Sequence, residues 1–326
     1  MKVLTLTAFL LYAVSCFPGD KLAEQQLLAI AQHQANLFQK ENGPFQLEAD
    51  FTAQIQVPMK GHLILKWEAS DRSWSKIVMG PFEQIAIRDG EKSYIVRNHP
   101  YTPLRIAELF NLLYFAQNLE GLAVKKQKTR TEGGVQITCL ETRRESSKEA
   151  RKHEVCLNAT SHDVVSEEWE LPPDERRKKQ YSEYAEFGSL RYPRKLELFV
   201  NGSNAVTAHL TNLATTTALD PRLLVAPAGA IERRVCEGMK HAVPLKTPEP
   251  AYPKSASQNG MVGDTVVSMT VLTDGSVDDI QLMGKSAHSM DESTLQTLKS
   301  WKFKPAMCGA EPVVSDMEVV VSFRLH

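Results

Sequence analysis

The sequence predicts an α+β protein with a large antiparallel, β-rich domain that carries two helices, and a small C-terminal domain of two strands, a helix and a strand. Short runs of alternating apolar and polar residues, separated by turn residues, fill most of residues 45–213. Two stretches, 21–40 and 104–119, instead have apolar residues at helical spacing. The final part, 251–326, alternates again around one helical stretch.

Length and composition indicate two domains and exclude one class of partner. The chain has 326 residues, 42% of them hydrophobic, so it can bury two ordinary cores. We expect a signal peptide at 1–16, a β-rich domain at 20–215, a linker at 216–250 and the small domain at 251–326. The formal net charge of -1 provides no overall field to hold nucleic acid, so we predict no nucleic-acid partner.

The first residues predict export. A short positive start, Met1-Lys2, precedes an uncharged apolar run at 3–14, and small residues lead to Cys16, as in a secretory signal peptide. The run is shorter than the roughly 20 residues that a spanning helix needs. Cys16 follows a small residue, so a bacterial lipid anchor at this cysteine is an alternative to its removal with the signal peptide. We therefore expect a periplasmic or envelope-associated protein.

The four remaining cysteines predict two disulfides. An even number of cysteines in an exported chain favours disulfides, and Cys139, Cys156, Cys236 and Cys308 allow three pairings. Cys139 and Cys156 lie in neighbouring β-like runs and could face each other across a hairpin, which leaves Cys236 with Cys308. Metal binding is the rival interpretation, but the sequence has no Cys-x-x-Cys pair.

The densest basic run, Arg176-Arg177-Lys178-Lys179, is flanked by acidic residues, which predicts a solvated loop. The helix at 21–40 should end at Gly43-Pro44. The predicted strands of the large domain are 51–57, 61–67, 75–79, 85–88, 93–96, 122–128, 135–141, 154–157, 164–170, 181–187, 195–200 and 206–213. Residues 220–250 have no sustained period and predict a linker held by Cys236.

The last domain is predicted as a hairpin, a helix and a closing strand. Asp274-Gly275 is the turn of the hairpin. The predicted elements are strands at 265–272 and 277–282, a helix at 290–301 and a strand at 313–325.

These elements carry a set of residues that resembles the TonB C-terminal domain family, over about 245–326. The matching residues are Tyr252-Pro253, Gly260-x-x-Gly263, Asp274-Gly275, Trp301-x-Phe303-x-Pro305 and the strand at 319–325. Each also has a physical reason. Tyr252 and Trp301 anchor a small core, Gly263 and Gly275 permit turns, and Pro305 ends the helix and directs the chain into the last strand. These residues identify a fold and no catalytic site.

The resemblance implies binding by strand addition, in which an extended peptide from an outer-membrane receptor or another envelope protein pairs with an exposed sheet edge. The equivalent edge here is the last strand, with Val319, Val320, Val321, Ser322 and Phe323 as its central residues. A TonB-like component of energy-coupled outer-membrane transport is an alternative. It is disfavoured because a signal peptide replaces the membrane anchor and the linker is short.

The large domain loosely resembles the lipoprotein-carrier (LolA-like) half-barrel. The residues behind this resemblance are Gly61-x-Leu63, Trp67, Arg72-x-Trp74 and Asp89-Gly90 before Tyr94. Such folds hold acyl chains in an apolar groove. The resemblance therefore implies a second function, a periplasmic carrier whose partner is a lipid or lipoprotein.

No sequence motif predicts an active site, a metal site or a cofactor. The histidines are scattered and mostly in polar loop contexts, and no His-Glu-x-x-His, Gly-x-Ser-x-Gly or phosphate-loop motif occurs. Glu167 and Glu168 are strand neighbours that point to opposite faces. We therefore predict a non-enzymatic protein; an exported hydrolase would need a cluster of titratable side chains in one cleft.

Overall fold

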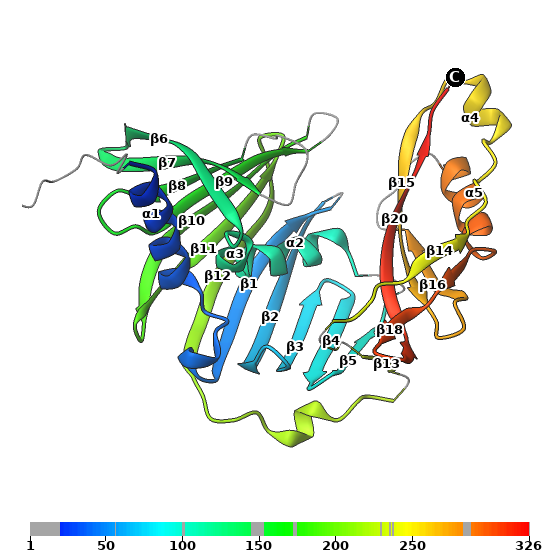
Figure 1. The fold of residues 1–326 in the computed structure, drawn as a ribbon, viewed down its shortest axis with the longest axis horizontal. Helices are drawn as coiled ribbons and strands as arrows, with labels where there is room; N and C mark the ends of the chain where they lie inside the picture. Colours follow the sequence, from blue (N-terminus) through cyan, green and yellow to red (C-terminus); the bar gives the residue numbers. More distant parts are fainter. Residues whose placement is uncertain are drawn as a thin grey trace, which may run out of the picture.

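The computed structural model describes residues 20–55, 57–99, 102–144, 153–171, 175–228, 230–234, 236, 238–282 and 288–325. The predicted signal peptide and Cys16 lie outside these residues. Figure 1 shows a large curved sheet beside a small sheet with its own helix. No helix among the described residues is long and apolar enough to cross a membrane.

The large sheet has thirteen strands in the order β13-β5-β4-β3-β2-β1-β12-β11-β10-β9-β8-β7-β6, so it is open and ends at β13 and β6. Its strands are β1 (Phe45–Gln54), β2 (Pro58–Ala69), β3 (Arg72–Met79), β4 (Phe82–Asp89), β5 (Lys92–Arg97), β6 (Leu122–Glu132), β7 (Val135–Arg144), β8 (His153–Asn158), β9 (Val164–Leu171), β10 (Glu175–Phe187), β11 (Leu190–Val200), β12 (Ser203–Thr215) and β13 (Ile231–Arg234). The predicted β-rich α+β class is confirmed.

Three helices fill the concave side of the large sheet: α1 (Asp20–Ala35), α2 (Leu104–Leu113) and α3 (Phe115–Asn118) (Figure 1). Alternate residues of β1 face them and are buried, which places one apolar cluster between sheet and helices. Its largest fully buried side chains include Phe45, Leu47, Leu109, Leu112, Phe115 and Tyr192.

Both predicted helices are longer than the observed ones. The first ends at Ala35 because Leu37 turns into the core, and the Asn42 amide fixes this turn by donating to the Asn36 carbonyl at 2.9 Å. The second is interrupted at Tyr114, whose ring stacks on Phe38 with centroids 3.9 Å apart. Packing between distant segments thus overrides the local helical pattern.

The prediction of a loop at the basic run is wrong, because these residues form the first half of β10. Successive side chains of a strand point to opposite faces, so Arg177 and Lys179 face the helices and Arg176 and Lys178 face outward. A carboxylate partner accompanies each inward cation: Glu108 for Arg177 at 2.9 Å and Glu167 for Lys179 at 3.0 Å.

The segment predicted as a linker contains regular structure. After a short 3₁₀ helix at Pro221–Leu224, strand β13 pairs with β5 at the end of the large sheet. Strand β14 (Val243–Lys246) then pairs with β17 (Lys302–Lys304). Four-residue, charged strands carry no readable alternation, which is why the sequence did not predict them.

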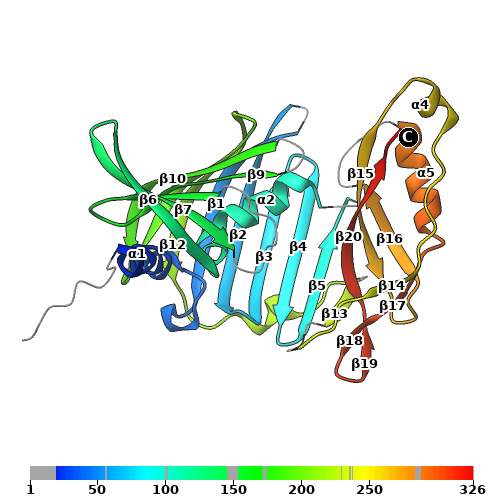
Figure 2. The same ribbon diagram turned by 45° about the horizontal axis from the view of Figure 1, so that its top comes forward.

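The C-terminal part has a three-stranded sheet in the order β16-β15-β20. Its elements are α4 (Lys254–Gln258), β15 (Gly263–Val271), β16 (Val277–Leu282), α5 (His288–Leu298), β17, β18 (Ala306–Cys308), β19 (Glu311–Val313) and β20 (Ser315–Phe323). Figures 1 and 2 show α5 on the face turned away from the large sheet. Val267, Met269, Leu298 and Phe303 form the buried core beneath α5.

Two element boundaries differ from the predictions here. The helix ends at Leu298, three residues before Trp301, and the predicted strand at 313–325 is divided between β19 and β20. The short strands β17 and β18 were not predicted.

Candidate partner-binding site

Strand β20 lies at one edge of the small sheet. Its nine residues pair with β15 along their whole length, from Val271 opposite Ser315 to Gly263 opposite Phe323. No described strand pairs with its other side, because β20 is the last strand in the sheet order. An edge strand presents unpaired backbone N–H and C=O groups to a further strand.

The five predicted edge residues have different environments. Val319 and Val321 are half-buried against the core under α5, and Phe323 is 4% exposed, with its ring edge-on to Tyr252 at 5.4 Å. Val320 points the other way and is 59% exposed, while the Ser322 hydroxyl donates to Asp264 at 2.6 Å. Three of the five side chains therefore pack inward, and Val320 is available to a partner.

Several motif residues build the frame behind β20. The Tyr252 hydroxyl donates to the Met261 carbonyl, and the Trp301 indole N–H donates to the Pro248 carbonyl at 2.9 Å. Phe303 is buried in the core under α5. These contacts hold the segment before β15 and the segment after α5 against the two apolar clusters of the small unit.

The Asp274-Gly275 turn has a strict requirement for glycine. Gly275 has a φ of 76°, and a Cβ added to it would lie 1.9 Å from the Phe303 carbonyl oxygen. Asp274 accepts a hydrogen bond from the Ser276 N–H at 2.8 Å, and the Ser276 hydroxyl lowers the pKa of the Asp274 carboxyl. The turn therefore brings the β15–β16 hairpin into direct backbone contact with β17.

Two predicted roles are wrong. Gly263 is not a turn residue, because it is the first residue of β15 and is absent from the positive-φ glycines of the described chain. Pro305 does not end the helix, since α5 stops at Leu298 and Pro305 lies between β17 and β18. Pro253 immediately precedes α4, a position that suits proline because no helical N–H is needed there.

The structure contains two disulfides, Cys139–Cys156 and Cys236–Cys308. Cys139 and Cys156 are directly opposite each other on β7 and β8. Cys236 follows β13, and Cys308 ends β18, so the second disulfide connects the end of the large sheet with the C-terminal part.

Ion pairs join the face of the small sheet opposite α5 to the end of the large sheet. Arg233 of β13 lies 2.5 Å from Asp316 of β20, and Arg97 of β5 lies 3.0 Å from Asp279 of β16. Thr270 of β15 donates to Asp316 at 2.9 Å. The sequence did not indicate these contacts, because a charged residue in a short strand does not reveal which distant residue it pairs with.

A second cluster of charges is buried in the large sheet. Glu167 lies 3.0 Å from both the Lys179 ammonium and the His153 ring, and Lys179 is 5.0 Å from the centre of the Trp169 ring. His153 is the first residue of β8, one residue before the strand predicted at 154–157, and His62 and His209 lie in β2 and β12, where strands were predicted. Every group of this cluster has an internal partner, which favours a structural role over a catalytic one.

The Glu167 carboxyl should make stability depend on acid pH. Burial alone raises its pKa, but Lys179 and His153 outweigh burial and hold the pKa at about 2, below the ordinary value of 4.5. A carboxyl whose pKa is lower in the folded state than in the unfolded state stabilises the fold at pH values above its unfolded-state pKa. This stabilisation is lost as the pH falls through the folded-state pKa. We expect the stability difference between the natural protein and Glu167→Gln to shrink between pH 4.5 and 2. Urea unfolding across this range measures it, and a constant difference would contradict this assignment.

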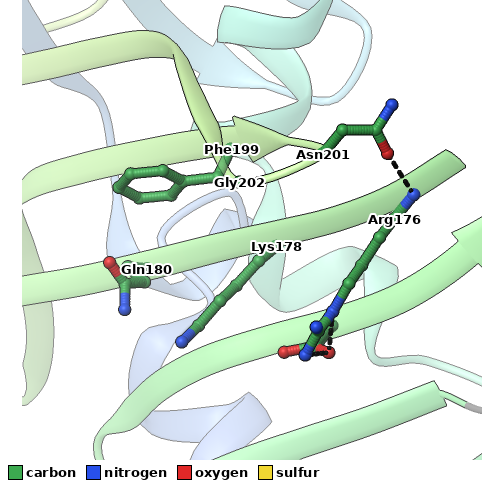
Figure 3. Close-up of a pocket in the computed structure, with 7 residues that line it drawn as sticks. Arg176, Lys178, Gln180, Phe199, Asn201 and Gly202 are labelled. Atoms are coloured by element: carbon green, nitrogen blue, oxygen red, sulfur yellow. Dashed lines mark hydrogen bonds and ion pairs between the residues drawn. The ribbon is translucent and has the colours of Figure 1, made fainter.

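The outer face of β9, β10 and β11 has a hollow of about 560 Å³ (Figure 3). Lys178, Gln180 and Phe199 line it, together with Arg176. Arg176 does not offer a free cation, because its guanidinium is paired with Glu168, to which Nε donates at 2.6 Å. The hollow is open, its lining combines apolar and polar surface, and it lies on the sheet face opposite the helices.

The geometry defines a β-rich protein with a small C-terminal unit that presents an edge strand. Residues 248–325 match the family described as Gram-negative bacterial TonB protein C-terminal, so the predicted resemblance of this segment is confirmed. Protein TonB of Pseudomonas aeruginosa is 30% identical over 84 residues, which are 26% of this chain and 25% of that protein. This chain thus spans about a quarter of the length of that relative.

Solved structures show similarity to each part of the chain. The solution structure of the Pseudomonas aeruginosa TonB CTD is 27% identical and covers 27% of this chain and 96% of its own, with a TM-score of 0.24. A LolA superfamily protein from Nitrosomonas europaea is 10% identical and covers 62% of this chain and 97% of its own, with a TM-score of 0.44.

Proposed function

We propose that this protein is a non-enzymatic envelope protein whose TonB-type C-terminal unit binds an extended segment of another envelope protein by strand addition to β20. The observation that carries the proposal is the edge position of β20 in a segment that matches the TonB C-terminal family. Main-chain hydrogen bonds would supply most of the affinity, and the exposed Val320 would supply an apolar contact.

The domain division follows the same proposal. A β-rich domain at 20–215 would be the body of the protein, residues 216–250 would connect it, and 251–326 would be the binding domain. Export by the N-terminal signal peptide, with removal or lipidation of Cys16, would place both domains in the periplasm or at the envelope. The connecting segment would also act as a structural part, because β13 belongs to the large sheet.

A carrier function for the large domain receives no support from its concave side. There, the side chains of α1, α2 and α3 pack against the sheet in one cluster whose central residues, Leu37, Leu109 and Tyr192, are at most 1% exposed. An acyl chain would have to displace these helices. Strand addition at β20 requires no such rearrangement, and we therefore prefer it.

A proline scan of β20 tests the proposal. Successive backbone N–H groups of a strand point alternately to its two sides. One of Val320 and Val321 therefore points its N–H at β15, and the other points it at the open edge. Proline at the one removes a hydrogen bond to β15, whereas proline at the other blocks only the open edge. Binding of tiled synthetic peptides from the periplasm-facing segments of outer-membrane receptors is measured on the full mature chain. We expect one variant to lose binding at least about tenfold, roughly 1.4 kcal/mol, while keeping its melting temperature.

The control is proline in β16, the opposite edge of the small sheet, at Asp278 and at Ile280. These variants should bind the selected peptide like the natural protein wherever they remain folded. If a peptide binds and both β20 proline variants that remain folded bind it unchanged, β20 is not the site.

A further inference from the structure

The two parts of the molecule share no apolar core. Each buried apolar cluster of the described chain lies entirely within residues 27–224 or entirely within residues 242–323. The ion pairs that join the parts come from Arg233 and Arg234 of β13 and from Arg97 of β5. Two parts that meet without a large hydrophobic interface are expected to move relative to each other.

Charges of β13 make contacts in two directions. Glu232 accepts hydrogen bonds from Lys92 at 3.0 Å and from the Tyr94 hydroxyl at 2.8 Å, which fix β13 to β5. Arg233 binds Asp316 of β20. Arg234 lies 2.6 Å from Glu91, in the turn between β4 and β5, and 2.5 Å from Glu311 of β19.

These ion pairs are too weak to hold the C-terminal unit alone. The carboxylates of Asp279, Asp316 and Glu311 have side-chain exposures of 31%, 41% and 63%, against 17%, 10% and 32% for their arginine partners, so solvent and salt screen the pairs from the carboxylate side. Ion pairs at such exposure contribute about 0–1 kcal/mol each. A covalent tie at the same place would therefore decide whether the contact persists.

The Cys236–Cys308 disulfide is such a tie. Cys236 lies two residues after the end of β13, and Cys308 ends β18, next to the turn that leads to Glu311. Beside it, Lys240 and Met307 exchange two backbone hydrogen bonds at 3.0 and 2.9 Å. The disulfide thus holds the β18–β19 hairpin next to β13 and keeps Glu311 near Arg234 and Asp316 near Arg233.

The two disulfides differ in accessibility. Cys139 and Cys156 are each 2% exposed and lie within the large sheet, whereas Cys236 and Cys308 are both half-buried. Thiol–disulfide exchange requires an attacking thiolate to reach a sulfur atom, so the second disulfide should react first.

We propose that the Cys236–Cys308 disulfide is a redox-sensitive latch that docks the C-terminal unit on β13. An envelope dithiol protein would open it: one thiolate attacks a sulfur of the disulfide, a mixed disulfide forms, and the second thiol resolves it. Two thiols form on this chain and one disulfide forms on the reductant. Reduction would free Asp316, and with it the first half of β20, from Arg233; this consequence for partner binding rests on the proposed function.

The test uses the full mature chain and needs no partner. An unnatural amino acid that is labelled without cysteine chemistry replaces each of the exposed residues Lys60 and Lys299. Pulsed electron paramagnetic resonance then measures the distance between the two spin labels. Dithiothreitol serves as the reductant, and alkylation with mass spectrometry reports which cysteines have opened. We expect Cys236 and Cys308 to be alkylated first, and the single narrow distance of the oxidised protein to be lost at that point.

Two double variants separate the latch from general loosening. Cys236→Ser with Cys308→Ser should show the broad distribution without reductant, whereas Cys139→Ser with Cys156→Ser should keep the narrow one. A narrow distance that survives alkylation of Cys236 and Cys308 would overturn the proposal, as would opening of Cys139–Cys156 first. Peptide titration of the oxidised and the reduced protein tests the proposed function separately. If reduction releases the C-terminal unit but neither form binds any peptide, strand addition is contradicted and the latch proposal still holds.

Discussion

Replacing Gly275 by alanine is expected to be the most damaging single change in the C-terminal unit. The new Cβ would lie 1.9 Å from the Phe303 carbonyl oxygen, in a backbone conformation with a φ of 76°. A left-handed conformation costs about 1–2 kcal/mol for a residue with a side chain, and overpacking adds about 1–3 kcal/mol. We therefore expect Gly275→Ala to reduce the local stability of the small sheet by about 2–5 kcal/mol.

Hydrogen exchange read by mass spectrometry measures this loss at β15 and β20, with the large sheet as an internal reference. Gly309→Ala is the matched control, because Gly309 also has a positive φ, 63°, but no atom within 4 Å of an added Cβ. Gly309→Ala should reduce the local stability only by the cost of the left-handed conformation, about 1–2 kcal/mol. Equal losses in the two variants would show that the close contact with β17 is unimportant.

Replacing Lys179 by methionine is expected to destabilise the large sheet by about 3–5 kcal/mol, because it leaves the buried Glu167 carboxylate with one partner fewer. Methionine fills a similar volume and cannot replace the charge. Urea unfolding measures the loss. Adding Glu167→Gln should recover part of it, since the second substitution removes the uncompensated charge.

Lys178→Met is the control for this experiment. Lys178 is the neighbouring residue on β10 but lines the outer hollow and has no ion pair among the described residues. Its loss should change stability by at most about 0.5 kcal/mol. The burial of the Lys179–Glu167 pair would be contradicted if the two lysine variants were equally stable.

Much of the fold follows from local patterns. The twelve predicted strands of the large domain overlap strands β1–β12, the first of them only in part, because each has alternating residues bounded by turn signals. The hairpin and helix of the small domain follow from the same rules and from the motif around Trp301. Neighbouring cysteine runs suggested the pairs that the structure contains.

What the sequence missed depends on contacts between distant segments. Lys179 is read as a loop residue in isolation, because its partner Glu167 is in another strand and the pair is buried only in the folded sheet. Arg233 gives no signal at all, since its contacts to Asp316 and Thr270 come from a four-residue strand. The stop of α5 before Trp301 likewise has no sequence signal, because no glycine or proline stands between Leu298 and Trp301.

The resemblance to the TonB C-terminal domain predicted an edge at the last strand, and the sheet order places β20 at an edge of the small sheet, next to β15.

The most direct test of the central claim is an NMR measurement of a bound peptide on the isotope-labelled full chain. The claim predicts nuclear Overhauser contacts between the backbone of an unlabelled receptor-derived peptide and the backbone of Ser315–Phe323, with slowed amide exchange at alternate residues of β20. A peptide that binds with its contacts confined to the large sheet, and leaves amide exchange in β20 unchanged, would contradict it.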